Sequence, residues 1–413
     1  MGKHEQHNPL HPRRLMGART GGKQVSAWVV GAVVAGLLVG VGGVAVGVLV
    51  ARGGGSKVVS AANPPGSGGP PIADTTTTEP PPPITVTSVT PANNATGVSA
   101  SATVSVTFSR NLSSATPMPR LRPAVPGSWA RSGPETLSFT PSGTYAPLAN
   151  EKLVIPGGPD GVLSTKGATL AKGQIDHFNV QAGSTLRLQQ LMSMLGYSPL
   201  SWTPAGIPIL PTDTAAQNAA AFSPPAGTFA WRNTGWPTNL TALWKPGNYN
   251  QLTKGLVMAF EADQGLTPDG VAGPLVWNAM LHALAAHQIN TGGYNFALTR
   301  ESSPETLTIW HNGKQVFHSV ANTGVSGAPT ALGTFNVYER LRNQIMQGTN
   351  LDGSHYSDPV QFVAYFNGGD AVHYFPRGGY GSPQSLGCVE LPLGPASVAW
   401  PYLGYGTIVQ VVG

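Results

Sequence analysis

The stretch AVHYFPRGGYGSPQSLGCVELP, from Ala371 to Pro392, decides the fold and the chemistry of the C-terminal part of this chain. It places His373 on a short apolar strand and the only cysteine of the chain, Cys388, directly after Gly387 at a turn. With a single cysteine, the chain forms no internal disulfide, and zinc ribbons and iron–sulfur clusters are excluded because each needs several thiolates.

Cys388 and His373 are interpreted as a thiol–imidazole pair. A free thiol is only slightly ionised at neutral pH, and a nearby imidazole activates it by accepting the proton. Gly387 lets the backbone approach a reacting carbonyl, and the amides of Gly387 and Cys388 are expected to face the developing oxyanion. The competing interpretation is structural, because a lone cysteine is often a buried small hydrophobe and a lone histidine a core residue.

The segments before this stretch are rich in strands from about Tyr294 onwards. Thr306–His311 and Gln315–Ala321 flank Asn312-Gly313, a strong hairpin signal, and another strand is expected at Thr334–Tyr338. The segment TGVSGAPTALGTF from Thr323, the AVH strand and the SxGCV turn occur in an order that resembles the L,D-transpeptidase (YkuD-type) catalytic domain. The resemblance spans about residues 296–413 and implies a β-rich fold.

The resemblance also implies roles for individual residues. Cys388 would be the nucleophile, His373 the general base and Gly387 a backbone oxyanion donor, and the substrate contacts would be Ser385, Tyr356, Tyr374 and Glu390. The implied donor is a peptidoglycan tetrapeptide stem cut before its terminal D-Ala, and a neighbouring stem amine accepts the acyl group in a 3→3 cross-link. No cofactor or metal is implied.

Two positions depart from the family pattern. Leu386 stands where the family usually has histidine, and Glu390 stands where a basic or amide residue is common. Neither change removes the nucleophile or the base, so activity is favoured over a degenerate, membrane-tethered wall-binding scaffold. An L,D-carboxypeptidase that uses water as acceptor is a further alternative.

Residues 84–181 are predicted to form an Ig-like β-sandwich. Alternating apolar residues at Ala102–Phe108 are typical of a half-buried strand, and further short strands are expected at Leu137–Thr140, Lys152–Ile155 and Ile175–Val180. The segment TPANNATGV at Thr90–Val98 resembles the opening of bacterial Ig-like modules. No catalytic constellation occurs here, and a spacer role is expected.

Residues 184–286 change to helical spacing. Helices are expected around Leu188–Leu195, Thr253–Asp263 and Leu275–Leu284, with a DGVAGP turn before the third. This pattern resembles the three-helix peptidoglycan-binding type-1 domain and implies contact with glycan. An insert of about 50 residues carries aromatic side chains that suit either a core or sugar stacking, namely Trp202, Trp231, Trp236, Trp244 and Tyr249.

The N-terminal part is predicted to anchor the chain in a membrane. Residues 26–50 are uncharged and apolar, long enough as a helix (roughly 37 Å) to cross a hydrocarbon core of about 30 Å. The basic tail 1–25 is expected to stay in the cytoplasm, and residues 51–83 form a Pro/Gly/Thr-rich linker that holds the remaining domains outside. A cleaved signal peptide is the alternative, and small-residue pairs such as Gly36 and Gly40 permit an anchor-mediated dimer.

Composition and charge exclude other classes. Charged residues make up 10% of the chain, and most of its net charge of +5 lies in the basic tail, so no basic face for nucleic acid is expected. No lysine has serine three positions before it, which disfavours a serine D,D-transpeptidase. The histidines outside the AVH strand form no short-spaced ligand cluster for a zinc peptidase.

Overall fold

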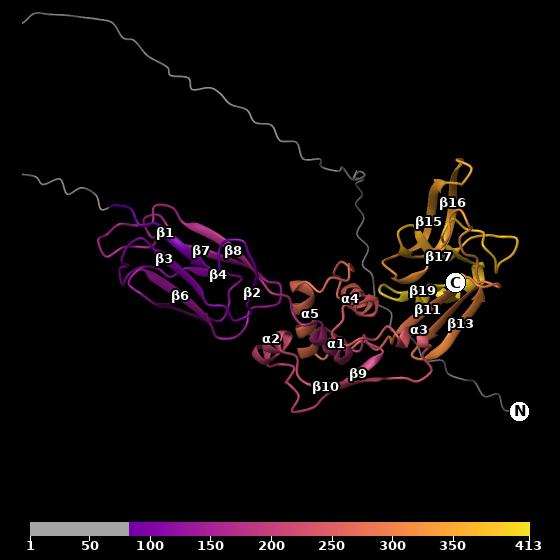
Figure 1. The fold of residues 1–413 in the computed structure, drawn as a ribbon, viewed down its shortest axis with the longest axis horizontal. Helices are drawn as coiled ribbons and strands as arrows, with labels where there is room; N and C mark the ends of the chain where they lie inside the picture. Colours follow the sequence, from indigo (N-terminus) through magenta and orange to yellow (C-terminus); the bar gives the residue numbers. More distant parts are fainter. Residues whose placement is uncertain (1–81) are drawn as a thin grey trace, which may run out of the picture. The chain divides into compact units, whose positions relative to one another are not determined.

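The computed structural model describes residues 82–413, and Figure 1 shows their arrangement. The basic tail, the expected anchor 26–50 and nearly all of the linker lie outside the described residues. Within residues 82–413, no helix has the length and hydropathy needed to cross a membrane.

The first domain is a sandwich of two four-stranded sheets, as the alternating pattern predicted. One sheet has the order β1-β3-β6-β5 and the other β2-β8-β7-β4. The strands are β1 (Val86–Thr90), β2 (Ala95–Val98), β3 (Val104–Phe108), β4 (Arg120–Arg122), β5 (Gly127–Arg131), β6 (Thr136–Pro141), β7 (Asn150–Ile155) and β8 (Gln174–Val180). Their inward-facing side chains, among them Val106, Leu137 and Phe178, form one core between the sheets.

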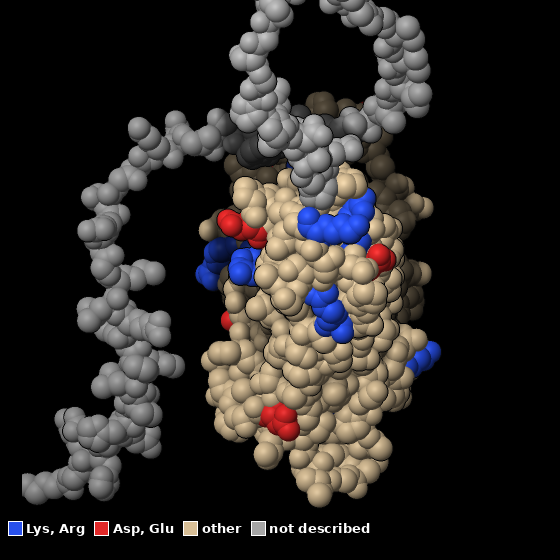
Figure 2. Space-filling model, turned by 90° about the vertical axis from the view of Figure 1, so that its left-hand side faces the viewer, with Lys and Arg blue, Asp and Glu red and all other residues tan. Residues whose placement is uncertain are grey.

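Charged side chains are sparse on the surface, in keeping with the composition. On the face that Figure 2 shows, lysine and arginine side chains stand in separate patches among uncharged atoms, with a few acids between them. Polar contacts on the strands are mostly made by hydroxyl groups, for example between Ser105 and Ser138 at 3.0 Å.

Glu151 is an exception to the apolar core of this sandwich. It occupies an inward position of β7, on the same side as Leu153 and Ile155, and is 2% exposed. One of its carboxylate oxygens has no hydrogen-bond partner among the described residues. Because burial disfavours the charged form, the pKa of Glu151 is raised to about 7.

Glu151 is therefore expected to make stability depend on pH. Its folded pKa lies above its unfolded value, so stability is full below about pH 4.5 and falls as pH rises towards 7. The variant Glu151→Gln should lose this dependence, worth up to about 3 kcal/mol, when urea unfolding is measured from pH 4 to 8. Asp160→Asn, on the surface of the same domain, is the control; an unchanged slope in Glu151→Gln would contradict the assignment.

The second segment contains the three expected helices and, in the insert, two strands and two short helices. Gly196, with φ +81°, follows the first of these helices, and Pro274 begins the last. Asn250 caps the middle helix by accepting the Thr253 amide at 3.2 Å. The elements are α1 (Thr185–Met194), β9 (Leu200–Pro204), α2 (Thr214–Phe222), β10 (Gly227–Trp231), α3 (Thr238–Thr241), α4 (Gln251–Asp263) and α5 (Pro274–Ala285).

The aromatic residues of the insert mainly extend the core of this helical segment. Trp231, Trp236 and Trp244 are half-buried against the cluster formed by α1, α4 and α5. Tyr249 is more exposed, at 42%, and its hydroxyl donates to the carbonyl of Gly270 in the DGVAGP turn. For these three tryptophans the structure favours packing over an open sugar-stacking face.

The C-terminal domain consists of two sheets that enclose a common core. One has the order β13-β12-β11-β19-β14 and the other β15-β16-β17-β18. Figure 1 shows the long β15–β16 hairpin projecting from this domain. The elements are β11 (Asn295–Arg300), β12 (Thr306–His311), β13 (Lys314–Val320), β14 (Gly333–Asn336), β15 (Glu339–Thr349), β16 (His355–Asn367), β17 (Asp370–Tyr374), β18 (Val389–Leu391), α6 (Leu393–Ala399), η1 (Trp400–Tyr402) and β19 (Ile408–Val412).

The Asn-Gly hairpin is confirmed, with positive φ at both Asn312 (49°) and Gly313 (78°) between β12 and β13. Side chains such as Ile309 and Val409 of the first sheet pack against Ala364 and Val372 of the second. One face of the β15-β16-β17-β18 sheet therefore packs against the core. Side chains on its opposite face are available to form a binding cavity.

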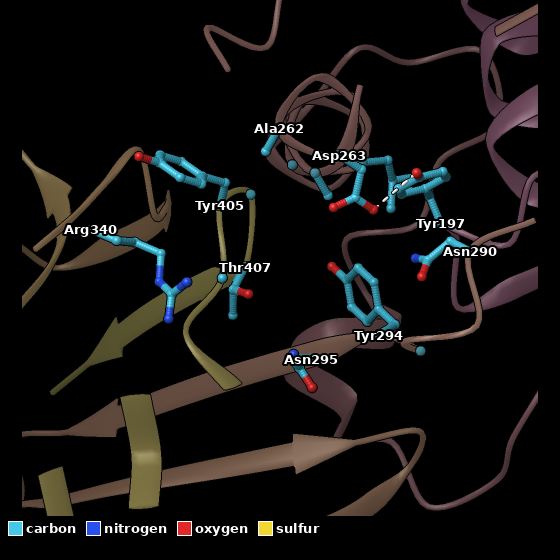
Figure 3. Close-up of a pocket in the computed structure, with 15 residues that line it drawn as sticks. Tyr197, Ala262, Asp263, Asn290, Tyr294, Asn295, Arg340, Tyr405 and Thr407 are labelled. Atoms are coloured by element: carbon cyan, nitrogen blue, oxygen red, sulfur yellow. Dashed lines mark hydrogen bonds between the residues drawn. The ribbon is translucent and has the colours of Figure 1, made fainter. Parts of the chain in front are cut away.

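The helical segment and the C-terminal domain share one hydrophobic core. Phe296, Leu298 and Ile408 from the domain pack in the same cluster as the helices. Where the two parts meet, a cavity of about 230 Å³ remains, and Figure 3 shows Tyr294, Asp263 and Arg340 around it. Tyr294 is 7% exposed, and its hydroxyl has no hydrogen-bond partner among residues 82–413.

Removal of this hydroxyl should stabilise the junction. A buried polar group without a partner costs about 1–3 kcal/mol of desolvation, so Tyr294→Phe is expected to raise the free energy of unfolding by about 1 kcal/mol. Urea denaturation followed by tryptophan fluorescence measures this, because Trp236 packs against Tyr294 at a ring distance of 5.8 Å. A loss of stability would show that the hydroxyl makes a favourable contact in solution.

Candidate active site

The parallel pairing of β17 and β18 brings the two expected catalytic residues together. Val372 pairs with Val389 and His373 with Glu390, so Cys388 stands just before β18, beside the strand that carries His373. Val372 and Val389 both face the core. Because side chains alternate along a strand, His373, Glu390 and Cys388 all point to the opposite face of the sheet.

On that face lies a cavity of about 600 Å³ that both Cys388 and His373 line. A small apolar cluster that includes Val360, Val363 and Ala371 supports its floor, and Cys388 packs against this cluster. A bulge in β16 at Phe362, with φ +58°, shifts the alternation so that Val360 and Val363, three residues apart, both face this cluster, while Phe362 faces the core.

The thiol of Cys388 is neutral in this environment. Its sulfur lies 3.7 Å from the carbonyl oxygen of Gly369, a weak hydrogen bond. Burial is the main cause that raises its pKa to about 12, and the nearby carboxylates of Asp370 and Glu390 raise the pKa further. Cys388 therefore needs a base to become a nucleophile.

His373 is held as a neutral base. The side chain is 3% exposed, and its Nδ1 lies 2.9 Å from the carbonyl oxygen of Tyr374. A carbonyl only accepts hydrogen bonds, so Nδ1 carries the proton and Nε2 is free to accept one. Burial lowers the pKa of His373, which keeps the imidazole in this basic form.

Tyr374 is not placed as the sequence suggested. It follows His373 on the same strand, so its side chain points to the opposite face and packs against the domain core. It does not line the cavity that contains Cys388. Its contribution to the site is the carbonyl that orients His373, and the expected substrate contact of its side chain is corrected by this alternation.

The turn before Cys388 is organised by Ser385. The Ser385 hydroxyl donates to the carbonyl of Cys388 at 2.6 Å and accepts the Gly387 amide at 3.2 Å. Gly387 has φ +117°, and a Cβ there would lie 2.4 Å from Oδ1 of Asp370, so only glycine fits. The Cys388 amide donates to no group within residues 82–413, which leaves it better placed than the Gly387 amide to receive an oxyanion.

Glu390 forms a bidentate ion pair with Arg377. Arg377 Nε and Nη2 donate to the two carboxylate oxygens, each at 2.7 Å. Both residues line the cavity, and the Arg377 guanidinium lies 4.7 Å from the ring centroid of Phe375. Glu390, which departs from the family pattern, is thus neutralised by Arg377, thirteen positions earlier in the sequence.

Tyr356 and Leu386 both line the cavity, as does Tyr365. Tyr356 packs over Gly348 of the facing strand, where a Cβ would lie 2.5 Å from its hydroxyl. Burial is the main cause that raises the pKa of Tyr356 and of Tyr365, and the charge of an ionised Cys388 raises both further. Leu386 is 37% exposed at the end of the loop.

Sequence reasoning missed Asp370, Arg377 and Tyr365. Arg377 lies within the stretch Ala371–Pro392, and Asp370 directly precedes that stretch. The spacing of these residues does not indicate the direction in which their side chains point. Glu305 was also missed; it is 1% exposed and accepts the amide and hydroxyl of Thr323 at 2.6 and 2.8 Å. Glu305 thereby fixes the start of the TGVSGAPT loop.

Two family models match parts of the chain. Residues 79–174 match the bacterial Ig-like domain. Residues 298–411 match the L,D-transpeptidase catalytic domain. The helical segment 184–286 lies outside both ranges, so its peptidoglycan-binding character remains a prediction. No curated protein matches the chain.

Among solved structures, the chain resembles several L,D-transpeptidases. One from Mycobacterium smegmatis has 14% identity and a TM-score of 0.28, covering 80% of this chain and 100% of that one. L,D-transpeptidase 3 from Mycobacterium tuberculosis has 13% identity and a TM-score of 0.27, covering 79% and 98%. The catalytic domain of the Enterococcus faecium L,D-transpeptidase has 22% identity and a TM-score of 0.27, covering 30% and 100%.

The ion pair of the transpeptidase-like domain (residues 294–413) should be important for its stability. Arg377→Met leaves the Glu390 side chain, 5% exposed, without a counter-charge, and is expected to cost about 2–4 kcal/mol. It should also raise the pKa of His373, because Arg377 lowers that pKa and Glu390 raises it. Urea unfolding and NMR titration of His373 measure the two effects.

The double variant Arg377→Met/Glu390→Gln is the control for this prediction. Since it removes both charges, it should recover much of the lost stability and return the pKa of His373 towards its value in the unsubstituted protein. Equal losses in the single and double variants would instead assign the effect to the packing of Arg377 on Phe375.

Proposed function

We propose that this protein is a peptidoglycan L,D-transpeptidase that acts through Cys388. The observation that carries the proposal is the joint placement of Cys388 and His373 on one cavity, within the residues that match the L,D-transpeptidase catalytic domain. Cavity size, a thiol, a neutral imidazole and a free backbone amide together suit acyl transfer.

In the proposed reaction, the Cys388 sulfur attacks the carbonyl before the terminal D-Ala of a tetrapeptide stem. The thiol proton passes to Nε2 of His373, and the Cys388 amide binds the oxyanion. The C–N bond then breaks, the imidazolium gives its proton to the leaving D-Ala amine, and a thioester remains. A stem amine attacks this thioester, the C–S bond breaks, and a 3→3 cross-link results.

The two groups are expected to start as a neutral pair. Since the thiol pKa is raised and the imidazole pKa is lowered, proton transfer to His373 accompanies the attack rather than preceding it. A bound carbonyl held close to the sulfur compensates for the low thiolate population. This arrangement also limits reaction of the thiol with other electrophiles.

The location of the enzyme is a further part of the proposal. The expected anchor 26–50 would hold the chain in the cell membrane with its N-terminus in the cytoplasm. The Ig-like domain and the helical segment would then carry the transpeptidase-like domain into the wall, where glycan contact by the helical segment would bring it near stem peptides. A carboxypeptidase and an inactive wall-binding scaffold are the alternatives that experiment must separate.

Mass spectrometry of the protein incubated with a tetrapeptide donor or a carbapenem tests the proposal. We expect an acyl adduct on Cys388 that Cys388→Ala lacks, and His373→Gln should slow acylation by roughly two to four orders of magnitude. Because its pKa is lowered, His373 should remain a base at pH 6.5, so the acylation rate should fall only at more acidic pH. Absence of an adduct with every donor would favour the scaffold.

A further inference from the structure

The charges that line the Cys388 cavity are unequally compensated. Four charged side chains line it, namely Asp358, Asp370, Arg377 and Glu390. Arg377 is bound to Glu390 in the one salt bridge found within residues 82–413. Asp358 and Asp370 therefore leave the cavity with a net negative charge, which favours a cationic ligand.

Asp370 lies against the turn that carries Cys388. It is the first residue of β17, and its Oδ2 accepts the Asn367 side-chain amide at 3.1 Å. Its Oδ1 faces Gly387, since a Cβ built on that glycine would lie 2.4 Å away. Burial is the main cause that raises the pKa of the Cys388 thiol, and the charges of Asp370 and of the paired Glu390 raise it further, whereas no such effect is found for Asp358.

The position of Asp370 is unfavourable for the first half of the reaction, in which Cys388 is acylated. A carboxylate beside a thiol opposes formation of the thiolate, so Asp370 does not assist attack on the donor stem. The second half of the reaction has a different requirement. There, the reacting group is a primary amine whose pKa is near 10.4, so it reaches the cavity as an ammonium ion.

We propose that Asp370 binds the ammonium group of the acceptor beside the thioester and so favours transfer to an amine over hydrolysis. The inference rests on the proposed transpeptidase function and names the residue that selects a cationic acceptor. Tyr356 and Tyr365 line the same cavity as Cys388 and provide aromatic surface for the cation and for the hydrocarbon chain that carries it.

In this second half, the acceptor nitrogen loses two protons. The acceptor ammonium gives one proton to the Asp370 carboxylate, whose partial burial favours its protonated form. The neutral nitrogen then forms the C–N bond as the C–S bond breaks. Its second proton passes through His373 to the departing sulfur and restores the thiol, and Asp370 returns its proton to water.

The test measures how the acyl-enzyme partitions between two fates. The full chain is acylated with a tetrapeptide donor, and the ratio of aminolysis to hydrolysis is measured by mass spectrometry with a stem-peptide acceptor at neutral pH. For Asp370→Asn we expect this ratio to fall at least about tenfold, the effect of one charge-assisted hydrogen bond, while acylation of Cys388 is no slower.

Two controls separate the acceptor site from a general disturbance. Hydroxylamine, an acceptor that is uncharged at neutral pH, should partition equally in the original protein and in Asp370→Asn. Asp160→Asn removes the same charge from the surface of the Ig-like domain and should leave the ratio unchanged.

Two results would overturn the inference while leaving the proposed function intact. One is an unchanged ratio in Asp370→Asn, and the other is an equal fall with hydroxylamine, which would indicate distortion of the turn at Gly387. Absence of any adduct on Cys388 in the original protein contradicts the proposed function itself, and the acceptor site falls with it.

Discussion

The parallel pairing of β17 with β18 is the constraint on which the site depends. One backbone register, with Val372 opposite Val389, sets which residues face the core and which face the cavity. A shift of this register by one residue would place Cys388 and His373 on opposite faces of the sheet and expose one of the two valines. The core between the two sheets of the domain therefore fixes the catalytic face, because burial of Val372 and Val389 is favourable only in this register.

The electrostatics of the cavity follow from its partial burial. Desolvation favours the neutral forms of the Cys388 thiol and the His373 imidazole. The buried Glu390 carboxylate needs a counter-charge, which Arg377 supplies. Cys388 and His373 are both uncharged before substrate binds. Proton transfer between them therefore begins only when a substrate carbonyl is bound. Asp370 differs from Glu390 because it has no salt bridge within residues 82–413, so a cationic ligand is favoured beside it.

Local sequence signals were sufficient for most of the fold. Short apolar runs predicted four strands of the Ig-like sandwich, namely β3, β6, β7 and β8. Helical spacing predicted α1, α4 and α5, and Asn312-Gly313 predicted the β12–β13 hairpin. Each of these signals acts over a few residues, which is why they can be read without knowledge of the partner strands. The shared core of the helical segment and the C-terminal domain was not visible, since Phe296 and Ile408 reach it from distant parts of the chain.

By itself, the sequence singled out the central residues of the candidate site: one thiol at Cys388, one imidazole at His373, and Gly387 at a turn that requires a positive φ. Only the tertiary structure decided the roles of their neighbours. It turned the Tyr374 side chain away from the cavity, paired Glu390 with Arg377, and set Asp370 against Gly387. Residue type and spacing are local properties, whereas the direction of a side chain depends on strand register and packing, which the whole fold determines.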